Sequence, residues 1–165
     1  FIGAQEDATL PARVLWPKVA RAVEIPVIAA GGIMTGVDIN EALAAGAKAV
    51  QMGTAFLVCD ESGISHDYKF RLINAGDTPT RLTRAFSGRY ARGLENRFMK
   101  QLEDVEKELP AYPIQNALTT PIRAAAAAKG DTELMSLWAG AEVRRARAMP
   151  AAKLMQTLVA EMRTE

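Results

Sequence analysis

Cysteine and histidine are nearly absent from this sequence, and it has no long uninterrupted hydrophobic run. The single cysteine, Cys59, has no partner for an intramolecular disulfide, and with the single histidine, His66, it cannot form a metal site of soft ligands. The apolar runs are shorter than the ~18 residues that a membrane-spanning helix needs. We find no pattern of a secretory leader. These absences favour a cytoplasmic protein without a bound metal and without a membrane partner.

An excess of charge of one sign is also lacking. Lys and Arg number 20, Asp and Glu number 19, and the net charge is +1, which argues against nucleic-acid binding across the whole chain. Hydrophobic residues make up 49% and charged residues 24%, as in globular proteins. A length of 165 residues corresponds to one domain or a part of one. Because the chain begins at Phe1 in a loop-like stretch, we expect a processed or truncated start.

The first third of the chain predicts a β-α-β unit. An amphipathic helix is expected over 10–23, and apolar runs over 26–30 and 49–52 each end at glycine, which predicts two buried strands. Strands joined by a single crossover helix are expected to be parallel.

The crossover helix itself carries a clear start signal. Thr35 and Asp38 have the spacing of a capping box, with Asp where Glu or Gln is usual, so a helix should run over 37–45 and end at Gly46. Its inner face is expected to consist of Ile39, Ala42 and Leu43.

The rest of the chain is predicted to be mainly helical. We expect helices over 62–74, 94–109, 113–129, 131–139 and 150–162, and one short strand over 80–86. Two parallel strands cannot form a sheet that is covered on both faces, so they indicate either a small α/β domain with a helical tail or the end of a larger barrel. Both interpretations remain open at this point. In the second, the chain is an α/β fold that is the C-terminal part of a TIM (β/α)8 barrel, with the last βα units in residues 1–78 and a mainly helical region in 79–165.

Glycine-rich loops follow both predicted strands. Gly31 and Gly32 follow the first, and Gln51, Met52, Gly53 and Thr54 end the second. The carboxyl ends of neighbouring parallel strands lie side by side, so the main-chain N–H groups of both loops and the Thr54 hydroxyl could hold a phosphate. Lys48 precedes the second strand at its opposite end and should not reach the anion. The alternative is that the glycines serve only the turns, and neither loop has a P-loop or G-x-G-x-x-G pattern.

Several segments together resemble the nitronate monooxygenase family, formerly called 2-nitropropane dioxygenases. They are IPVIAAGGI at 25–33, ALAAGA at 42–47, VQMGTAF at 50–56, AFSGRYARGL at 85–94, NRF at 96–98 and LWAG at 137–140. The resemblance implies a TIM barrel with an extra helical domain, non-covalently bound FMN, and oxidation of alkyl nitronates with O2. It implies that Gly31, Gly32, Gln51, Met52, Gly53 and Thr54 bind the FMN phosphate.

Two departures from the family pattern limit what this chain should do alone. The family's catalytic His belongs to a Gly-Gly-His segment just before the loop where this chain begins, so we assign no catalytic residue here. Ala141 stands where Gln is expected after LWAG. We therefore expect no turnover of nitronates by the chain in isolation.

Three alternatives stay open. An FMN-dependent enoyl-acyl-carrier-protein reductase is similar through both glycine loops, but the SGR segment at 87–89 and LWAG favour the first interpretation. A barrel like that of inosine-monophosphate dehydrogenase carries Asp where this chain has Ala30. A non-catalytic phosphate-binding α/β fragment is the third.

The remaining polar and aromatic residues point mainly to structure. His66 and Asp67 are neighbours on a helix and face different ways, which favours a surface or capping role over catalysis. Cys59 is expected to be a buried, inert thiol. We expect Trp138 and Tyr112 to be packing anchors rather than parts of a ligand site. For the arginines we favour ion pairs over a site for an anion or RNA; these are Arg81, Arg84, Arg89, Arg92, Arg97, Arg144, Arg145 and Arg147.

Overall fold

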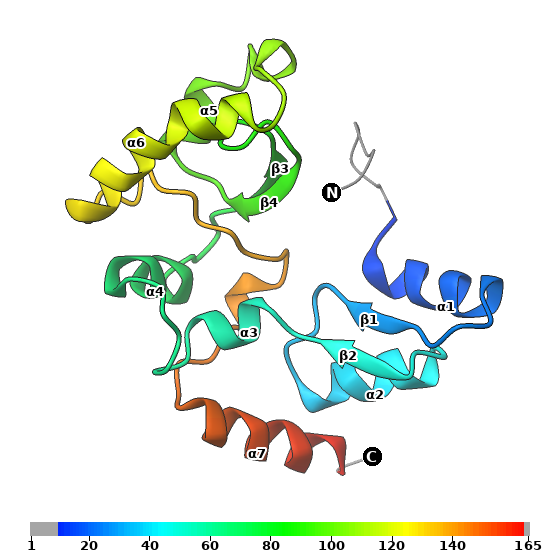
Figure 1. Cartoon of the computed structure of the whole chain (residues 1–165). Helices are drawn as coiled ribbons and strands as arrows, with labels where there is room; N and C mark the ends of the chain where they lie inside the picture. The colour runs from blue at the N-terminus through cyan, green and yellow to red at the C-terminus, as the bar shows by residue number, and fades with distance from the viewer. Residues whose placement is uncertain (1–9, 164–165) are drawn as a thin grey trace. The chain divides into compact units, whose positions relative to one another are not determined.

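The structure, a computed structural model, describes residues 10–163 and consists of two compact units (Figure 1). One is made of residues 10–63 and 142–163, and we call it the parallel unit after its sheet. The other is made of residues 64–141, and we call it the antiparallel unit. The chain thus leaves the parallel unit after residue 63 and returns to it at residue 142. The division into domains at residue 78 stays a prediction.

The predicted β-α-β unit forms the centre of the parallel unit. Strand β1 (Ile28–Ala30) pairs with β2 (Ala49–Gln51) in parallel register, with Ala29 opposite Val50, and α2 (Gly36–Ala44) connects them. One face of this sheet is buried through Ala29, whereas Ile28 on the other face is 62% exposed. The expectation of strands buried on both sides is therefore wrong within the described residues, because no described element covers the second face.

Helices α1 (Ala12–Ala22) and α7 (Ala151–Met162) complete the core of the parallel unit. The core residues include Trp16, Ile39, Ala42, Leu154 and Leu158. Helix α7 packs so closely on α2 that a Cβ at Gly36 would lie 2.3 Å from the Leu158 carbonyl oxygen. The capping box of α2 forms as predicted, but Leu43 is exposed rather than inward. Asp38 takes its place on the buried face.

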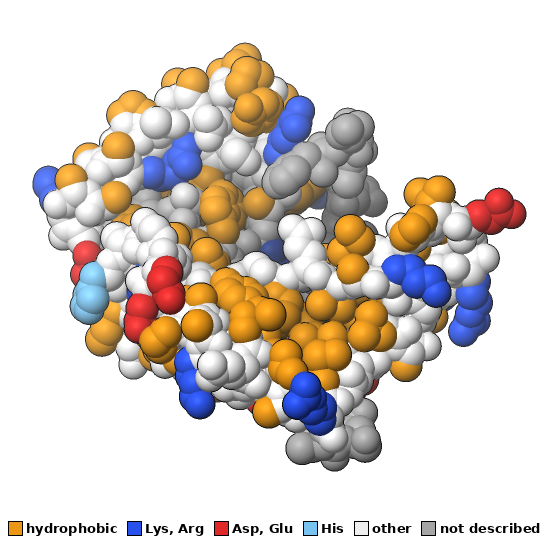
Figure 2. All heavy atoms as spheres, turned by 60° about the horizontal axis from the view of Figure 1, so that its bottom comes forward, with side chains coloured by type: hydrophobic (Ala, Val, Ile, Leu, Met, Phe, Trp, Pro, Cys, Tyr) orange, Lys and Arg blue, Asp and Glu red, His pale blue; other side chains and the backbone are white. Residues whose placement is uncertain are grey.

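The surface of α7 that faces away from this core remains apolar. Met155 and Val159 are exposed on it. In Figure 2, which brings the bottom of Figure 1 forward, hydrophobic side chains gather on the face that carries α7. Helices α1 and α7 confirm the predictions over 10–23 and 150–162, whereas the short helix α3 (Thr54–Leu57) was not predicted.

The antiparallel unit is built on a hairpin rather than on helices alone. Strand β3 (Thr80–Thr83) pairs with β4 (Ala91–Leu94), and Gly93 forms a further bridge to Trp138. The Leu94 N–H donates to the Leu137 carbonyl at 2.8 Å, and the Ala139 N–H donates to the Arg92 carbonyl at 3.1 Å. The predicted helix over 131–139 is therefore wrong, because residues 137–139 bond to β4.

The predicted helix over 94–109 is also largely wrong. It is replaced by the end of β4, by α5 (Arg97–Gln101) and by a short 3-10 helix, η1 (Glu106–Glu108). Asn96 caps α5 by accepting from the Met99 N–H at 3.2 Å, and its amide donates to the Met135 carbonyl at 2.8 Å. Within this segment, Leu94 and Phe98 are buried and Val105 is exposed.

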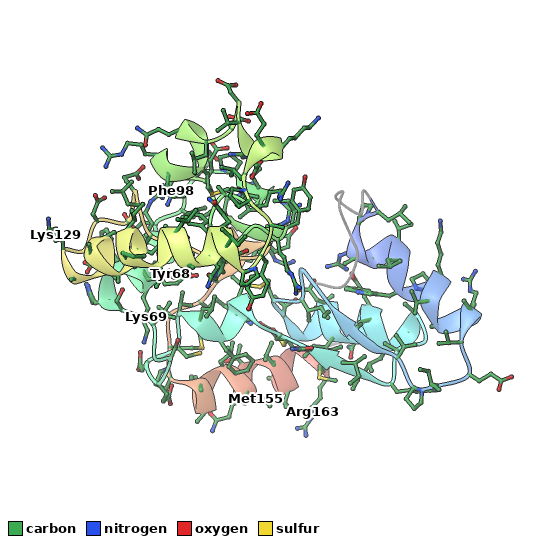
Figure 3. The ribbon with its side chains drawn as sticks, turned by 45° about the horizontal axis from the view of Figure 1, so that its top comes forward. Tyr68, Lys69, Phe98, Lys129, Met155 and Arg163 are labelled. Atoms are coloured by element: carbon green, nitrogen blue, oxygen red, sulfur yellow. The ribbon has the colours of Figure 1, made fainter. Side chains whose placement is uncertain are left out.

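Two further helices belong to the antiparallel unit. Helix α6 (Ile114–Ala128) confirms the prediction over 113–129, and α4 (His66–Ile73) is shorter than predicted. The Gln115 amide of α6 donates to the Ala85 carbonyl at 2.6 Å, which fixes α6 to the chain after β3. On α4, the Tyr68 hydroxyl donates to the Trp138 carbonyl at 2.7 Å. Tyr68 is labelled in Figure 3.

Among residues 10–163, no helix combines the length and the apolar character that crossing a bilayer requires.

Candidate functional site

The glycine loops begin side by side at one edge of the parallel sheet. Ala30, the last residue of β1, lies opposite Gln51, the last residue of β2, so Gly31 and Met52 start at the same level. This confirms the predicted proximity of the two loops. Trp16 of α1 positions the edge, because its indole N–H donates to the Ala30 carbonyl at 3.0 Å and its ring is buried.

The first loop depends on glycine for its backbone conformation. Gly31 has φ +94° and Gly32 has φ +72°, two successive values in the left-handed region that side chains strongly disfavour. A Cβ at Gly32 would also lie 3.4 Å from Glu142 Cγ. The alternative interpretation was that these glycines serve only the turn. It therefore accounts in part for the presence of glycine at positions 31 and 32.

The second loop does not need its glycine for any packing reason. Gly53 has φ −100° and precedes α3, and a Cβ placed on it would meet no atom within 4 Å. Gly31, Gln51 and Gly53 are exposed, and Gly32, Met52 and Thr54 are partly buried. Among the described residues, the N–H groups of Gly32 and Gly53 have no hydrogen-bond acceptor. Open space and unpaired donors are what a phosphate group requires here, so the residues fit the phosphate of FMN.

The lysine beside this sheet lies where predicted. Lys48 precedes β2, and its N–H donates to the Val27 carbonyl at 2.8 Å, at the opposite end of the strands. The glycine-loop edge therefore has main-chain dipoles rather than Lys48 as its source of positive potential.

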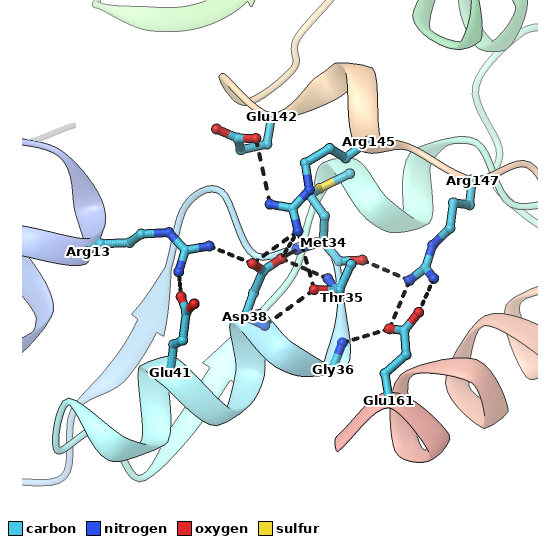
Figure 4. Close-up of polar contacts among 10 residues, drawn as sticks. All are labelled: Arg13, Met34, Thr35, Gly36, Asp38, Glu41, Glu142, Arg145, Arg147 and Glu161. Carbon is cyan, nitrogen blue, oxygen red and sulfur yellow. Dashed lines mark hydrogen bonds and ion pairs between the residues drawn. The ribbon is translucent and has the colours of Figure 1, made fainter. Parts of the chain in front are cut away.

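A buried carboxylate holds the segment that follows Gly32 (Figure 4). Asp38 is 2% exposed and accepts from the Met34 N–H at 2.8 Å, the Thr35 N–H at 2.9 Å and Arg145 Nη2 at 2.8 Å. Arg13 of α1 donates to its other oxygen. Burial alone would raise the pKa of Asp38, but these hydrogen bonds outweigh it and lower the pKa to about 2.

A second ion pair ties the same segment to α7. Arg147 binds Glu161 at 2.5 Å and donates to the Met34 carbonyl at 2.9 Å, and Glu161 accepts from the Gly36 N–H at 2.8 Å. Burial alone would raise the pKa of Glu161, but the hydrogen bonds from Arg147 and Gly36 lower it. The ion pairs predicted for Arg145 and Arg147 are confirmed. Their partners were not predicted, because Arg145 and Asp38 are 107 positions apart and Arg147 and Glu161 are 14 apart, and no local pattern links residues at either separation.

The arginines of the antiparallel unit divide into two groups. Arg81 lies near Glu95 at 3.4 Å and Glu106 at 3.5 Å, and Arg97 lies 3.5 Å from Asp131, as the ion-pair interpretation predicts. Arg84 instead donates to the Leu109 carbonyl at 3.1 Å. Arg89 stacks over the Tyr112 ring, 4.5 Å from its centre.

The other single residues lie mostly where expected. His66 is exposed at the start of α4, and the preceding Ser65 caps that helix by accepting from the Tyr68 N–H. Cys59 is buried. Trp138 packs edge-on against Phe86, with ring centres 5.4 Å apart, which confirms it as a packing residue. Tyr112 is exposed, so the packing role predicted for it is wrong.

The fold and the site define an α/β protein with glycine loops at the carboxyl ends of two parallel strands. Two solved structures are similar to this chain. A nitroalkane oxidase from Streptomyces ansochromogenes matches with TM-score 0.87 and 47% identity, over 97% of this chain and 47% of that chain. FabK from Thermotoga maritima matches with TM-score 0.76 and 34% identity, over 92% of this chain and 48% of that chain.

The family model for nitronate monooxygenase matches residues 2–161, and the chain belongs to that family. A probable nitronate monooxygenase of Staphylococcus aureus (strain Newman) is 46% identical over 145 residues, which cover 88% of this chain and 41% of the relative. The chain thus spans less than half the length of this relative.

Proposed function

We propose that this chain supplies the FMN phosphate-binding part of a nitronate monooxygenase built on a TIM barrel. The observation that carries the proposal is the pair of adjacent glycine loops, where the N–H groups of Gly32 and Gly53 are unpaired within residues 10–163 and open space lies beside Gly53. Gly31, Gly32, Gln51, Met52, Gly53 and Thr54 would hold the phosphate. The bare face of the β1–β2 sheet supports the barrel, because parallel strands are normally covered on both faces.

FMN would supply the redox chemistry with O2 as the oxidant, and this chain would supply position and electrostatics. The amides bind and orient the phosphate group. The hydrogen bonds of Asp38 and of Glu161 keep the segment after Gly32 in one conformation. The catalytic His is expected outside this chain, so we propose that nitronate oxidation needs the full-length gene product. Measurable flavin-dependent nitronate oxidation by residues 1–165 alone would contradict this part.

An enoyl-acyl-carrier-protein reductase is the alternative enzyme. The nitroalkane oxidase matches this chain with 47% identity and FabK with 34%. Family membership and this difference favour nitronates as the substrate class.

The decisive experiment changes Gly53 to Ala in the full-length gene product and measures FMN affinity. The new Cβ meets no protein atom within 4 Å, so the variant should fold as the parent does. A phosphate bound at the loop would meet that methyl group, and we expect the Kd for FMN to rise about tenfold or more.

Gly63→Ala is the matched control, because its Cβ also meets nothing within 4 Å and Gly63 lies outside both loops. We expect its Kd to equal that of the parent. Equal FMN binding by the parent and both variants, or a parent that binds no FMN, would contradict the proposal.

A further inference from the structure

The antiparallel unit contains a pocket of about 460 Å³ that the FMN proposal does not use. It lies where β4, the turn before β4 and the start of α6 meet. Among the described residues, its lining contains three arginines and no carboxylate side chain; the residues that matter here are Arg89, Arg92, Tyr112, Asn116, Arg123 and Trp138. A volume in the ~300–1,000 Å³ range is typical of small-molecule sites.

Neutral groups orient the guanidinium groups of Arg89 and Arg123. Arg123 Nη2 donates to Asn116 Oδ1 at 2.8 Å. Arg89 lies over the Tyr112 ring. An amide and an aromatic ring fix the direction of a guanidinium group without cancelling its charge, as a carboxylate would.

Carboxylates are available in the same unit and bind other arginines. Arg81 and Arg97 both form ion pairs with acidic residues. Within the described residues, Arg89 and Arg123 form none. Burial lowers the pKa of Arg123, which means that its charge is poorly solvated where it lies. A bound anion would compensate for that lost solvation.

The lining also has a flat apolar part. The Tyr112 ring and the Trp138 ring both border the pocket. Trp138 is held edge-on to Phe86, so its position is fixed by the core of the unit. Aromatic faces next to arginines are suited to an anion that carries a planar unsaturated group rather than to a bare inorganic ion.

We propose that this pocket binds a small organic anion, with its oxyanion group on Arg89 and Arg123 and its planar part against Tyr112 and Trp138. The proposal does not depend on the glycine loops, because every residue that it uses belongs to residues 80–138.

Phenyl phosphate is the probe, titrated calorimetrically into the FMN-saturated full-length gene product so that the glycine loops are occupied. We expect saturable binding, with inorganic phosphate binding more weakly and benzyl alcohol not binding. Arg89→Gln and Arg123→Gln should each raise the Kd for phenyl phosphate about tenfold or more, since each removes a charge-assisted contact.

Arg97→Gln is the matched control, because Arg97 belongs to the same unit but lies on Asp131 outside the pocket. Its Kd should equal that of the parent. Arg89 is exposed, so Arg89→Gln should keep the parent's unfolding midpoint, and a loss of binding can then be assigned to the pocket.

The proposal is overturned if phenyl phosphate shows no saturable binding, or if Arg89→Gln and Arg123→Gln bind it as the parent does. The two proposals fail separately. Gly53→Ala tests only FMN, and if the parent binds no FMN, the phenyl phosphate titrations of Arg89→Gln, Arg123→Gln and Arg97→Gln still decide whether the pocket binds the anion.

Discussion

Replacing Asp38 with Asn should weaken the parallel unit more than any surface charge change in it. The side chain keeps its size and one acceptor oxygen, so the capping box of α2 can persist in part. The negative charge is lost, and Arg145 and Arg13 lose the carboxylate that both of them bind. These contacts join α1, α2 and the segment before α7, so their loss affects the whole unit (Figure 4).

The expected cost follows from the pKa. A pKa of about 2, against the ordinary 3.8, corresponds to about 2 kcal/mol of stability from the ionised form at neutral pH. Breaking a fully buried ion pair can cost ~3–5 kcal/mol. The side chains of Arg13 and Arg145 are 45% and 37% exposed, so water can solvate both after the change. We therefore expect Asp38→Asn to lower the free energy of unfolding by about 2–3 kcal/mol.

Urea unfolding of the full-length gene product at several pH values tests this. Because the folded-state pKa is lowered, the contribution of Asp38 is complete above its ordinary pKa and is lost as the pH falls toward 2. The difference between the parent and Asp38→Asn should therefore shrink by roughly 1 kcal/mol between about pH 6 and about pH 3. Glu41→Gln is the control, because Glu41 binds Arg13 from an exposed position and should cost only ~0–1 kcal/mol. An Asp38→Asn variant no weaker than Glu41→Gln, or a difference independent of pH, would refute the reasoning.

Three further substitutions test packing and hydrogen bonding by the same unfolding measurement. Gly36→Ala should lower the free energy of unfolding by about 2 kcal/mol or more, because its Cβ would lie 2.3 Å from the Leu158 carbonyl oxygen. A decrease of less than about 0.5 kcal/mol would contradict the close packing of α2 and α7. Glu106→Gln should cost ~1–3 kcal/mol, because Glu106 accepts from the Arg84 N–H at 2.7 Å; an unchanged midpoint would show that η1 is not held this way. Tyr68→Phe should cost about 1 kcal/mol through its lost hydrogen bond to a carbonyl, and a variant as stable as the parent would contradict that bond's contribution.

Local signals were sufficient for part of the fold. The capping box at Thr35 and Asp38 gave the start of α2, and glycines with positive φ follow α2 and α6 at Gly46 and Gly130. These features depend on backbone groups within a few residues, so the sequence displays them directly. The same locality explains why the adjacency of the glycine loops was predictable from two strands and one connecting helix.

The helices predicted over 94–109 and 131–139 are wrong because of long-range backbone pairing. The apolar spacing from Leu94 to Phe98 is real, and both side chains are buried. The Leu94 N–H nevertheless bonds to the Leu137 carbonyl, which draws both segments into extended pairing at the hairpin. Periodicity reports which side chains are buried, and it cannot report that a segment more than 40 positions away offers competing hydrogen bonds.

The partners of the arginines lay equally far beyond local patterns. Arg145 reaches Asp38 across 107 positions, and no spacing rule connects them. The window around Arg89 contained few acids, and the favoured ion-pair interpretation holds there for Arg81 and Arg97 but not for Arg89. Arg89 instead stacks over the Tyr112 ring. This contact depends on the tertiary position of the start of α6, which local sequence patterns do not give.

The two proposed anion sites attract their ligands by different electrostatic interactions, and these interactions suit different kinds of ligand. The glycine loops offer amide dipoles that are fixed by the Asp38 and Glu161 hydrogen bonds, so they select by geometry and suit a cofactor that stays bound. The arginine pocket offers the full charges of Arg89 and Arg123, which neutral partners hold, and full charges attract an anion from a distance and are screened by salt. A ligand that must arrive and leave repeatedly gains from that long-range attraction, whereas a resident cofactor does not need it. The pocket of the antiparallel unit is therefore the better candidate for the exchanging ligand, and the glycine loops for the permanent one.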